Sequence, residues 1–581
     1  MEKHRGRSSA TAMHAPGHRN HSNNFGRRAL ALLTAVVAGA GTLAACGDGG
    51  GAAKPQGGAG ESRVTVFNGA TGDAAENFNP FSPTALQPSR GIIYETLFYY
   101  NLMSSAEPKP MLATAYKWNA TGTELTVTTR EGVKWSDGTP FSAADVAFTF
   151  NLIAKTPSIN TNGLAATAKA TGPNTVVLTF QQTSFVSGPN VLGNTAIVPE
   201  HLWKSKDPAT DINRNPVGTG PYTVASFTPQ SFEMKRNATY WQQGKPQIEK
   251  VRFITLASAD AASGALLKGD VDWMSSFLPG IDQLLKGKKE LSWVNTPALT
   301  TSLFACSNAA LGCKGPQTDV AVRQAIYHAL DREQLNKLAF SNVAGVASPT
   351  LLVPDRDEKW MSPKVDKVVP QQPDTAKSES ILTAAGWAKG ADGIYAKNGQ
   401  RLTMTIQVVS GWSDYISAID AMTQQLRKAG MEIKSTQISS NEWNNRESKG
   451  TYQLSLNSLG LGPSTDPYFT YEGKYWSRNT AEVGKSASAN QARYANPAVD
   501  AAILAASKTN DEAAKKKQYE VIQEHIARDL PYIPVVLNST LTEFNNSRVT
   551  GWPTKDNMYA FPATWKAWDN GIVLQNLTPV K

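Results

Sequence analysis

Residues 131–146 read EGVKWSDGTPFSAADV and form the most specific segment of this sequence. Its centre is a turn, because Asp137 can accept a hydrogen bond from the backbone two residues on, and the glycine after it tolerates a positive φ. Ser142 is an N-cap residue in front of an apolar-periodic segment, which predicts that a helix begins there. Trp135 and Phe141 flank the turn, so we expect them to pin the turn and the helix to a core.

On either side of this stretch, short strands alternate with amphipathic helices. Apolar runs and period-two alternation predict strands at residues 63–67, 125–129, 175–180, 402–409 and 431–436. Helical periodicity predicts helices at residues 142–150, 320–339, 416–429 and, for the most part, 495–528. Over a chain of 581 residues, this mixture predicts the α/β class and more than one domain.

Further motifs are spread along the chain. They are NFNPF at 77–81, IYETL at 93–97, NPVGTGPY at 215–222, RNATYW at 236–241, LKGDVD at 267–272, VRQAI at 322–326, AGW at 385–387 and LPYIP at 530–534. Together with residues 131–146, their order and spacing resemble solute-binding protein family 5, the peptide- and nickel-binding lipoproteins of bacterial ABC importers. The resemblance extends over residues 62–540. Most of these motifs are turns and tight loops, so they identify the scaffold better than the ligand.

The resemblance implies a two-lobed fold of the periplasmic-binding-protein type (type II), in which crossover strands join the lobes and a hinge motion closes them on a ligand. It places lobe I at 62–298 with an extra subdomain at about 91–193, lobe II at 299–535, and a C-terminal return to lobe I at 536–581. It also implies a monomer that delivers its ligand to the permease and ATPase subunits of an ABC importer.

The first 45 residues are typical of a lipoprotein signal peptide. A basic start precedes an apolar run at 29–43, which is shorter than the roughly 20 residues that a spanning helix needs. The run ends in LAAC at 43–46, which resembles a lipobox. We therefore expect Cys46 to be lipidated, residues 46–61 to form a flexible tether, and the protein to be held on the outer face of the cell membrane. An arginine pair at 27–28 leaves twin-arginine export open beside the general secretory route.

Net charge and cysteine content describe the chain that remains after the leader is removed. The leader carries six Lys and Arg residues and one acid, so its removal lowers the formal net charge from +9 to +4, which gives no case for nucleic-acid binding. Cys306 and Cys313 remain after processing. Outside the cytoplasm, an even pair this close in sequence predicts a disulfide.

Signatures of catalysis and metal binding are incomplete in this sequence. His201, His328 and His525 lie far apart, and neither a His-Glu-x-x-His nor a Cys-x-x-Cys motif occurs. The GKS at 484–486 lacks the glycine that a P-loop has five residues earlier, and no Gly-x-Ser-x-Gly occurs. We therefore predict no catalytic residue, no metal and no cofactor. The enzyme alternative is an extracytoplasmic hydrolase with a paired-carboxylate cleft.

Aromatic residues in loops are the candidates for ligand contact, since binding clefts are mostly apolar with a few placed polar groups. The same residues could instead pack in a core. The candidates are Phe81, Trp412, Tyr415, Trp443, Asp466, Tyr468, Phe469 and Tyr471.

The class of ligand stays open between two oligomers. Peptide binders of the family hold the ligand's ammonium group with an aspartate in the segment that corresponds to 458–467, because an unpaired buried charge is costly. Here the only acid in that segment is Asp466, and the position that aligns with the aspartate is Gly462 or Pro463. Oligopeptides are the family default, whereas flat aromatic faces such as that of Trp412 suit β-linked oligosaccharides.

Overall fold

The structure is a computed structural model that describes residues 62–70 and 72–580. The predicted signal peptide, the tether and Cys46 lie outside the described residues. Within the described part, no helix is both long and apolar enough to cross a membrane.

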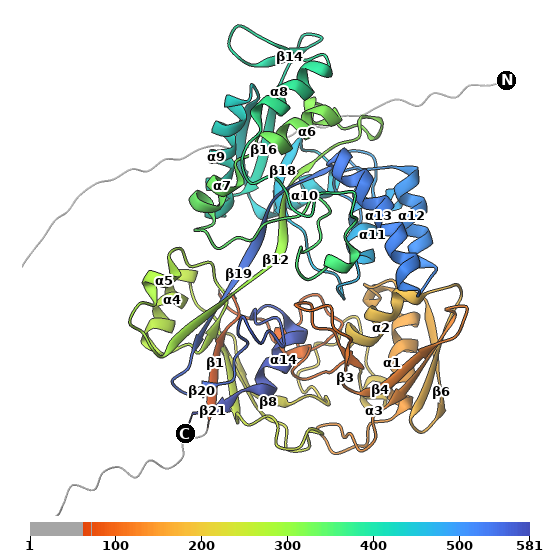
Figure 1. The fold of residues 1–581 in the computed structure, drawn as a ribbon. Coiled ribbons are helices and arrows are strands. Elements are labelled where there is room, and N and C mark those ends of the chain that lie inside the picture. Colours follow the sequence, from red (N-terminus) through yellow and green to blue (C-terminus); the bar gives the residue numbers. More distant parts are fainter. Residues whose placement is uncertain (1–61, 71, 581) are drawn as a thin grey trace, which may run out of the picture. The chain divides into compact units, whose positions relative to one another are not determined.

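A ten-stranded mixed sheet extends through the described part of the chain (Figure 1). Its strands, in spatial order, are β17 (Glu432–Ile438), β16 (Thr403–Val409), β18 (Leu454–Ser458), β12 (Leu291–Ala305), β19 (Tyr532–Asn545), β11 (Trp273–Met274), β1 (Arg63–Phe67), β10 (Lys250–Ile254), β9 (Ser231–Arg236) and β8 (Tyr222–Thr228). The long strands β12 and β19 pair antiparallel and connect the two halves of this sheet.

Buried apolar side chains separate into two sets on either side of these long strands. Three clusters draw on residues 64–294 and 541–577, and three draw on residues 303–536. We call the two parts lobe I and lobe II, as the sequence predicted. The predicted boundaries at 298/299 and 535/536 fall inside β12 and β19, which continue unbroken across them.

Lobe I surrounds its half of the sheet with short elements. Its helices outside the subdomain are α3 (Glu200–Trp203), α4 (Ala259–Lys268), α5 (Ile281–Leu284) and α14 (Ala567–Asn576), and its small strand pairs are β2 (Phe98–Tyr99) with β3 (Lys109–Pro110) and β20 (Val549–Thr550) with β21 (Thr578–Pro579). A separate four-stranded sheet with its own core builds the subdomain: β4 (Ala113–Trp118), β5 (Glu124–Thr129), β7 (Thr175–Phe180) and β6 (Ala166–Gly172), with helices α1 (Ala143–Lys155) and α2 (Gly188–Gly193).

The stretch at 131–146 joins that subdomain sheet to α1. Trp135 is fully buried and meets Phe141 edge to face, with ring centroids 5.8 Å apart. Ser142 caps α1, and the Asp145 carboxylate closes a capping box by accepting from the Ser142 backbone N–H at 2.9 Å. The same carboxylate accepts from the backbone N–H of Glu200 at 3.0 Å, so a local turn also holds a distant segment.

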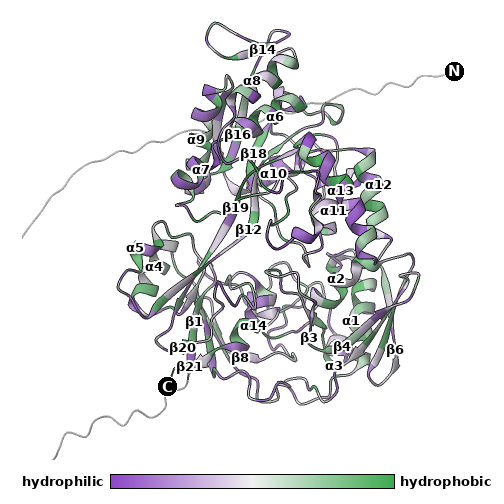
Figure 2. Ribbon diagram, viewed as in Figure 1, coloured by the Kyte–Doolittle hydropathy of each residue, from purple (hydrophilic) through white to green (hydrophobic). Residues whose placement is uncertain are grey.

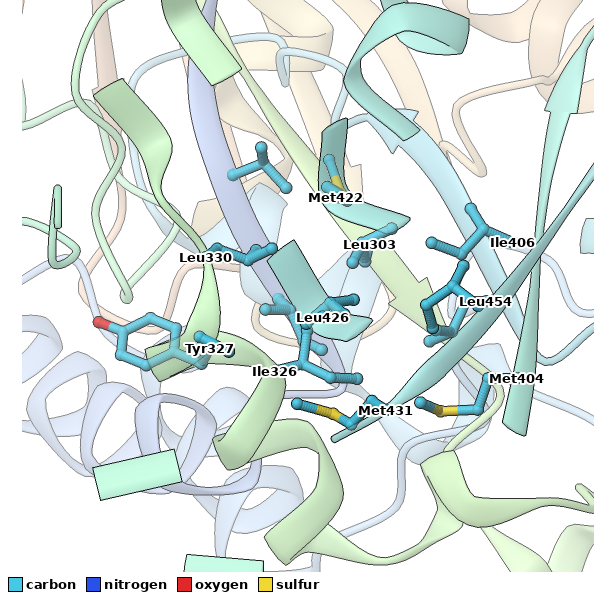
Figure 3. Close-up of a cluster of buried hydrophobic side chains, with 14 of the residues drawn as sticks. Leu303, Ile326, Tyr327, Leu330, Met404, Ile406, Met422, Leu426, Met431 and Leu454 are labelled. Carbon is cyan, nitrogen blue, oxygen red and sulfur yellow. The ribbon is translucent and has the colours of Figure 1, made fainter. Parts of the chain in front are cut away.

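Lobe II packs helices around strands β16, β17 and β18. The helices are α6 (Val320–Ala329), α7 (Arg332–Ala339), α8 (Thr375–Ala384), α9 (Ser413–Lys428), α10 (Ser440–Lys449), α11 (Tyr468–Tyr475), α12 (Pro497–Ser507) and α13 (Glu512–Asp529), and a small sheet holds β13 (Ala388–Lys389), β14 (Tyr395–Lys397) and β15 (Gln400–Arg401). Apolar side chains from α6, α9, β12, β16 and β18 meet in one core (Figure 3). Helices such as α9 and α13 carry both hydrophobic and hydrophilic residues, as expected for helices with one buried face (Figure 2).

Two predicted helices are each divided in the structure. The helix expected at 320–339 is broken at Leu330, whose backbone is extended, and Asp331 then caps α7 by accepting from the backbone N–H of Gln334. The helix expected at 495–528 consists of α12 and α13, and Asp511 caps the second of them. In both cases an aspartate begins the second helix. Its carboxylate accepts a hydrogen bond from a free backbone N–H at the helix start, which is more favourable than a position inside a continuous helix.

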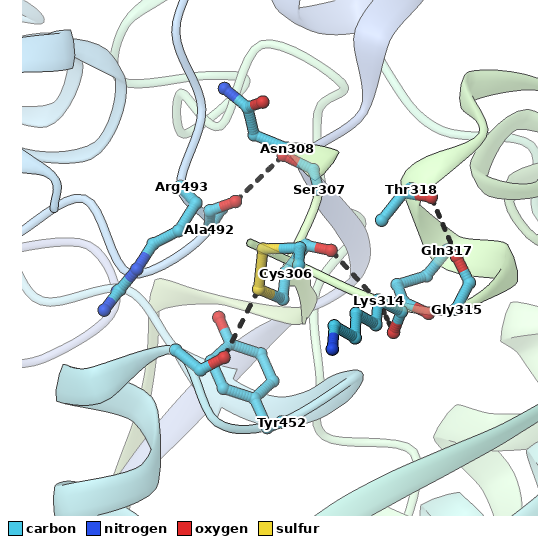
Figure 4. The surroundings of a disulfide bond; sticks show 12 residues. Cys306, Ser307, Asn308, Lys314, Gly315, Gln317, Thr318, Tyr452, Ala492 and Arg493 are labelled. Atoms are coloured by element: carbon cyan, nitrogen blue, oxygen red, sulfur yellow. Dashed lines mark hydrogen bonds between the residues drawn. A yellow bond between two sulfur atoms is a disulfide. The ribbon is translucent and has the colours of Figure 1, made fainter. Parts of the chain in front are cut away.

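Cys306 and Cys313 are joined by a disulfide, with their Cα atoms 5.5 Å apart (Figure 4). The bridge follows directly after β12. Next to it, the Gln317 side chain donates to the Cys306 carbonyl oxygen at 3.2 Å, and the Ser307 hydroxyl donates to the Ala492 carbonyl oxygen at 2.8 Å. This end of β12 is therefore tied to two other loops of lobe II.

Candidate functional site

The carboxyl ends of three lobe II strands lie at one edge of the sheet. β16 runs parallel to both β17 and β18, so Val409, Ile438 and Ser458 end at the same edge. β12 runs antiparallel to β18 with Thr301 opposite Ser458, so this edge lies where the long strands enter lobe II. In open α/β sheets, ligands bind outside the carboxyl ends of the strands.

An aromatic cluster covers this edge. Trp412 follows β16 at the start of α9, and its ring meets those of Trp443 and Tyr415 edge to face, with centroids 5.3 and 5.4 Å away. Trp443 and Tyr415 are almost fully buried, whereas Trp412 keeps 37% of its surface exposed. Three predicted residues are thus brought together, and the most exposed one presents an aromatic surface that a ligand can cover.

Hydrogen-bonding groups surround the cluster. The Tyr415 hydroxyl lies 2.6 Å from the Ser458 hydroxyl and 3.2 Å from that of Thr301, and it accepts from the Asn538 amide at 3.3 Å. Burial raises the pKa of Tyr415, so the phenol stays neutral. The indole N–H of Trp443 is buried and has no hydrogen-bond partner within residues 62–70 and 72–580. The edge therefore combines neutral donors and acceptors with one buried N–H that is unpaired among the described residues.

Asp466 has its own partners within lobe II. Its carboxylate lies 2.7 Å from the Lys515 ammonium group and also accepts a hydrogen bond from the Tyr519 hydroxyl, with both members of the ion pair largely buried. The α13 lysine thereby neutralises the only acid of the 458–467 segment. This carboxylate is a structural tie between α13 and the start of α11, not a free anchor for a ligand's cation.

Four further predicted residues lie in cores or pack against one. Tyr471 is fully covered, and its hydroxyl donates to the Thr350 carbonyl oxygen at 3.3 Å. Tyr468 is 7% exposed in the same cluster, with the partly buried Phe469 against it at 5.5 Å. Phe81 packs edge to face on Trp203 in lobe I, with centroids 5.2 Å apart. The expectation that these rings face a ligand therefore gains no support from their positions.

An exposed lobe I tryptophan outside the predicted set lies next to a residue that hydrogen bonds link to β19. Trp565 precedes α14 and is 44% exposed. The backbone N–H of its neighbour Thr564 donates to the Ser275 hydroxyl at 3.0 Å, and that hydroxyl lies 3.0 Å from the Thr542 hydroxyl of β19. Thr542 and Asn538 leave β19 on one face, since strand side chains alternate. Like Trp412, Trp565 is an aromatic residue in a loop, so the same sequence signal could have identified it as a candidate.

Both lobes line a cavity of about 910 Å³ beside β12. Residues 292–297 and 550–555 of lobe I and residues 343–345 of lobe II contribute to its wall. Elsewhere, the Arg356 guanidinium of lobe II donates to the Leu102 carbonyl oxygen of lobe I at 2.9 Å. The lobes thus touch at that loop, and the cavity has the volume of a small-molecule site.

Comparison with known proteins agrees with this arrangement. The family model "Bacterial extracellular solute-binding proteins, family 5 Middle" matches residues 107–482. The chain belongs to this family. Among relatives of this family 5 member, Protein XP55 of Streptomyces lividans is 30% identical over 436 residues, which are 73% of this chain and 75% of XP55. The glutathione-binding protein GsiB of Salmonella typhimurium is 26% identical over 514 residues, which are 84% of this chain and 92% of GsiB.

Solved structures show the same fold. The periplasmic oligopeptide-binding protein of an ABC transporter from Thermotoga maritima superposes with a TM-score of 0.82 at 27% identity, covering 90% of this chain and all of that one. Its mannohexaose-bound form superposes with a TM-score of 0.75 at the same identity, covering 90% of this chain and 99% of that one. The two-lobed periplasmic-binding-protein fold that the sequence predicted is thereby confirmed.

Family 5 proteins are extracytoplasmic solute-binding proteins and not enzymes. Among the residues that the structure describes, no group of three or more His, Cys, Asp or Glu side chains could hold a metal ion. The carboxyl edge of lobe II gathers an aromatic surface, hydroxyl and amide groups, the Asp414 carboxyl, and one N–H without a partner among the described residues.

Proposed function

We propose that this protein captures a small oligomeric solute outside the cell membrane, between its two lobes, and delivers it to the permease of an ABC importer. The observation that carries the proposal is the partly exposed Trp412 ring, with the unsatisfied Trp443 N–H beside it, at the carboxyl edge of lobe II. The long strands lead from that edge into lobe I. A ligand that contacts both lobes only when they are closed shifts the population toward the closed state.

Neutral oligosaccharides are the ligand class that this geometry favours. A sugar ring offers an apolar face to an indole, and its hydroxyls can bond to groups such as Ser458 and Asn538. The Asp466 carboxylate already pairs with Lys515, so its charge is offset before any ligand ammonium group arrives. The Thermotoga relative, described as an oligopeptide-binding protein, also has a structure with mannohexaose bound.

Oligopeptides are the second candidate, and one carboxyl group favours them. Asp414 lies two residues after Trp412 in the first turn of α9. Burial raises the pKa of this carboxyl, and its hydrogen bonds are to backbone N–H groups, with no cationic side chain paired to it in the described part of the chain. A peptide ammonium group would supply that missing charge. The relatives named for glutathione and oligopeptides fit this alternative.

A ligand screen separates the two classes. The mature protein is mixed with mannohexaose, with cello-oligosaccharides or with short peptides, and thermal unfolding is followed, since ligand at 100 times its Kd stabilises by about 2.7 kcal/mol. We expect stabilisation by oligosaccharide. Stabilisation by peptides alone would show that oligopeptides are the ligand class. Conversion of the bound compound into a product would refute the proposal that this is a binding protein.

The variant Trp412→Ala tests the proposed contact. Loss of the ring should weaken ligand binding by about 1–3 kcal/mol and leave the melting temperature without ligand nearly unchanged. The matched control is Trp476→Ala, which removes another partly buried lobe II tryptophan whose ring packs on the Arg478 guanidinium. Equal losses of affinity in both variants would contradict the proposed site.

The lipid anchor is part of the same proposal. We infer that Cys46 holds the protein at the outer face of the cell membrane, where it would meet the permease. A diacylglyceryl group supplies two acyl chains, and stable anchoring requires two such signals.

A further inference from the structure

Lobe II contains a second cavity, of about 460 Å³, at the end of the strands opposite to Trp412. β16 and β18 pair only at Ile406 with Leu454 and at Gln407 with Ser455. Before Leu454 the backbone pairing ends, and the Thr405 backbone N–H donates instead to the Gln453 side-chain oxygen at 2.8 Å; both residues line the cavity. Its wall includes Cys313, Lys314, Gln407, Arg446, Leu454 and Val483.

Gln407 supplies an unsatisfied acceptor in this wall. Its side chain is 2% exposed, and its carbonyl oxygen has no hydrogen-bond partner among the described residues. Buried polar groups are nearly always satisfied, by protein, water or a ligand. This amide therefore lacks a donor that something entering the cavity could provide.

A hydrogen-bond chain fixes the orientation of this amide. The Gln407 amide nitrogen donates to the Ser455 hydroxyl at 3.4 Å, and that hydroxyl donates to the Glu447 carboxyl at 2.6 Å. Glu447 also accepts from the Asn457 amide at 3.0 Å. The carbonyl oxygen on the other side of the Gln407 amide has no hydrogen-bond partner among the described residues.

The rest of the wall selects for negative charge. Lys314 is exposed at the rim, and the partly buried Arg446 forms an ion pair with Glu442 and has no other side-chain partner among the described residues. No acidic side chain lines the cavity, while Leu454, Val483 and the sulfur of Cys313 form its apolar part. A ligand here meets two cations at the mouth and an acceptor inside.

We propose that this cavity is a second binding site, separate from the oligomer site at Trp412, for a small carboxylate that also carries a hydroxyl group. The carboxylates lie against Lys314 and Arg446, and the hydroxyl donates to the Gln407 carbonyl oxygen. The two sites lie toward opposite ends of β16 (Thr403–Val409), because Thr405 and Gln407 line the cavity whereas Trp412 comes after the last residue of the strand.

Citrate and tricarballylate form a matched pair of probes, since they differ only in the hydroxyl group of citrate. Isothermal titration of the mature protein with each probe should show that citrate binds and that tricarballylate binds at least roughly fivefold more weakly, the factor that about 1 kcal/mol for one hydrogen bond corresponds to. Added salt should weaken both. Absence of citrate binding at millimolar concentration, or equal affinity for the two probes, would overturn the proposal.

Variants assign the contacts. Lys314→Ala, at an exposed position, should weaken both probes alike, whereas Lys286→Ala on an exposed loop of lobe I should change neither. Gln407→Met should abolish the difference between citrate and tricarballylate, and its melting temperature reports whether the fold survives. Trp412→Ala should leave citrate binding intact, so failure of the oligomer site and failure of this site are distinguishable. Citrate binding that is lost in Trp412→Ala but kept in Lys314→Ala would place citrate in the cleft and refute the second site.

Discussion

Because of Glu543, we expect the stability of this protein to fall as the pH rises from about 5 to about 8. It lies on β19, is fully buried, and accepts one long hydrogen bond, 3.3 Å from the backbone N–H of Ser276, while its other oxygen has no partner in the described chain. Burial in these surroundings raises the pKa of Glu543 to about 8 from its ordinary value of 4.5. The folded protein therefore holds this proton at pH values where the unfolded chain has lost it.

The sign of the effect follows from proton linkage. Stability from the protonated Glu543 is complete below pH 4.5 and is lost as the pH rises through about 8, because the folded state binds more protons in that window. At about 1.4 kcal/mol per pKa unit, the full loss is about 5 kcal/mol. Most of this loss falls between pH 5 and pH 8.

The variant Glu543→Gln is neutral at every pH and tests this reasoning. Relative to the wild type, its free energy of unfolding should be similar at pH 5 and higher by several kcal/mol at pH 8, measured from denaturant midpoints. Glu95 and Glu447, whose pKa values burial raises to about 7, remain in both proteins and cancel. Glu290→Gln, at an exposed site, is the control. A difference between variant and wild type that does not change from pH 5 to pH 8 would refute the argument.

Three further predictions concern single side chains. Cys46→Ala should release the protein from membranes, as cell fractionation would show; an unchanged membrane fraction would contradict the anchor. Mass spectrometry of the non-reduced protein should find the peptides of Cys306 and Cys313 linked, and removal of the bridge should cost about 2–3 kcal/mol; two free thiols would contradict it. Trp565→Ala should weaken oligomer binding by about 1–3 kcal/mol, as Trp412→Ala does; full affinity would remove lobe I's tryptophan from the site.

The sequence predicted features that depend on near neighbours. The turn and cap of residues 131–146 are local, and their outcome follows from Asp137 and Ser142. Trp412 was predicted as a ligand contact because it is an aromatic residue in a loop after a strand. Its ring packs on Trp443 on one side and stays partly exposed on the other. Such features need only backbone propensity and side-chain polarity.

Features set by distant partners could not be predicted in this way. The charge of Asp466 is cancelled by Lys515, 49 residues later, and no local pattern indicates that pair. The position of Trp565 depends on the contact of its neighbour with a hydroxyl 289 residues earlier in sequence. Tyr471 has the sequence surroundings of a loop aromatic, yet helices from other parts of lobe II cover it.

The place of β19 in the sheet has a consequence for biosynthesis. This strand lies between β11 and β12, although residues 275–290 connect those two strands in sequence and β19 is translated more than 200 residues after them. Until Tyr532–Asn545 has emerged, β11 and much of β12 lack the neighbour that pairs with them, and open strand edges invite aggregation. A nascent chain stopped before residue 532 should therefore require a holding chaperone, because its N-terminal half cannot close its own sheet.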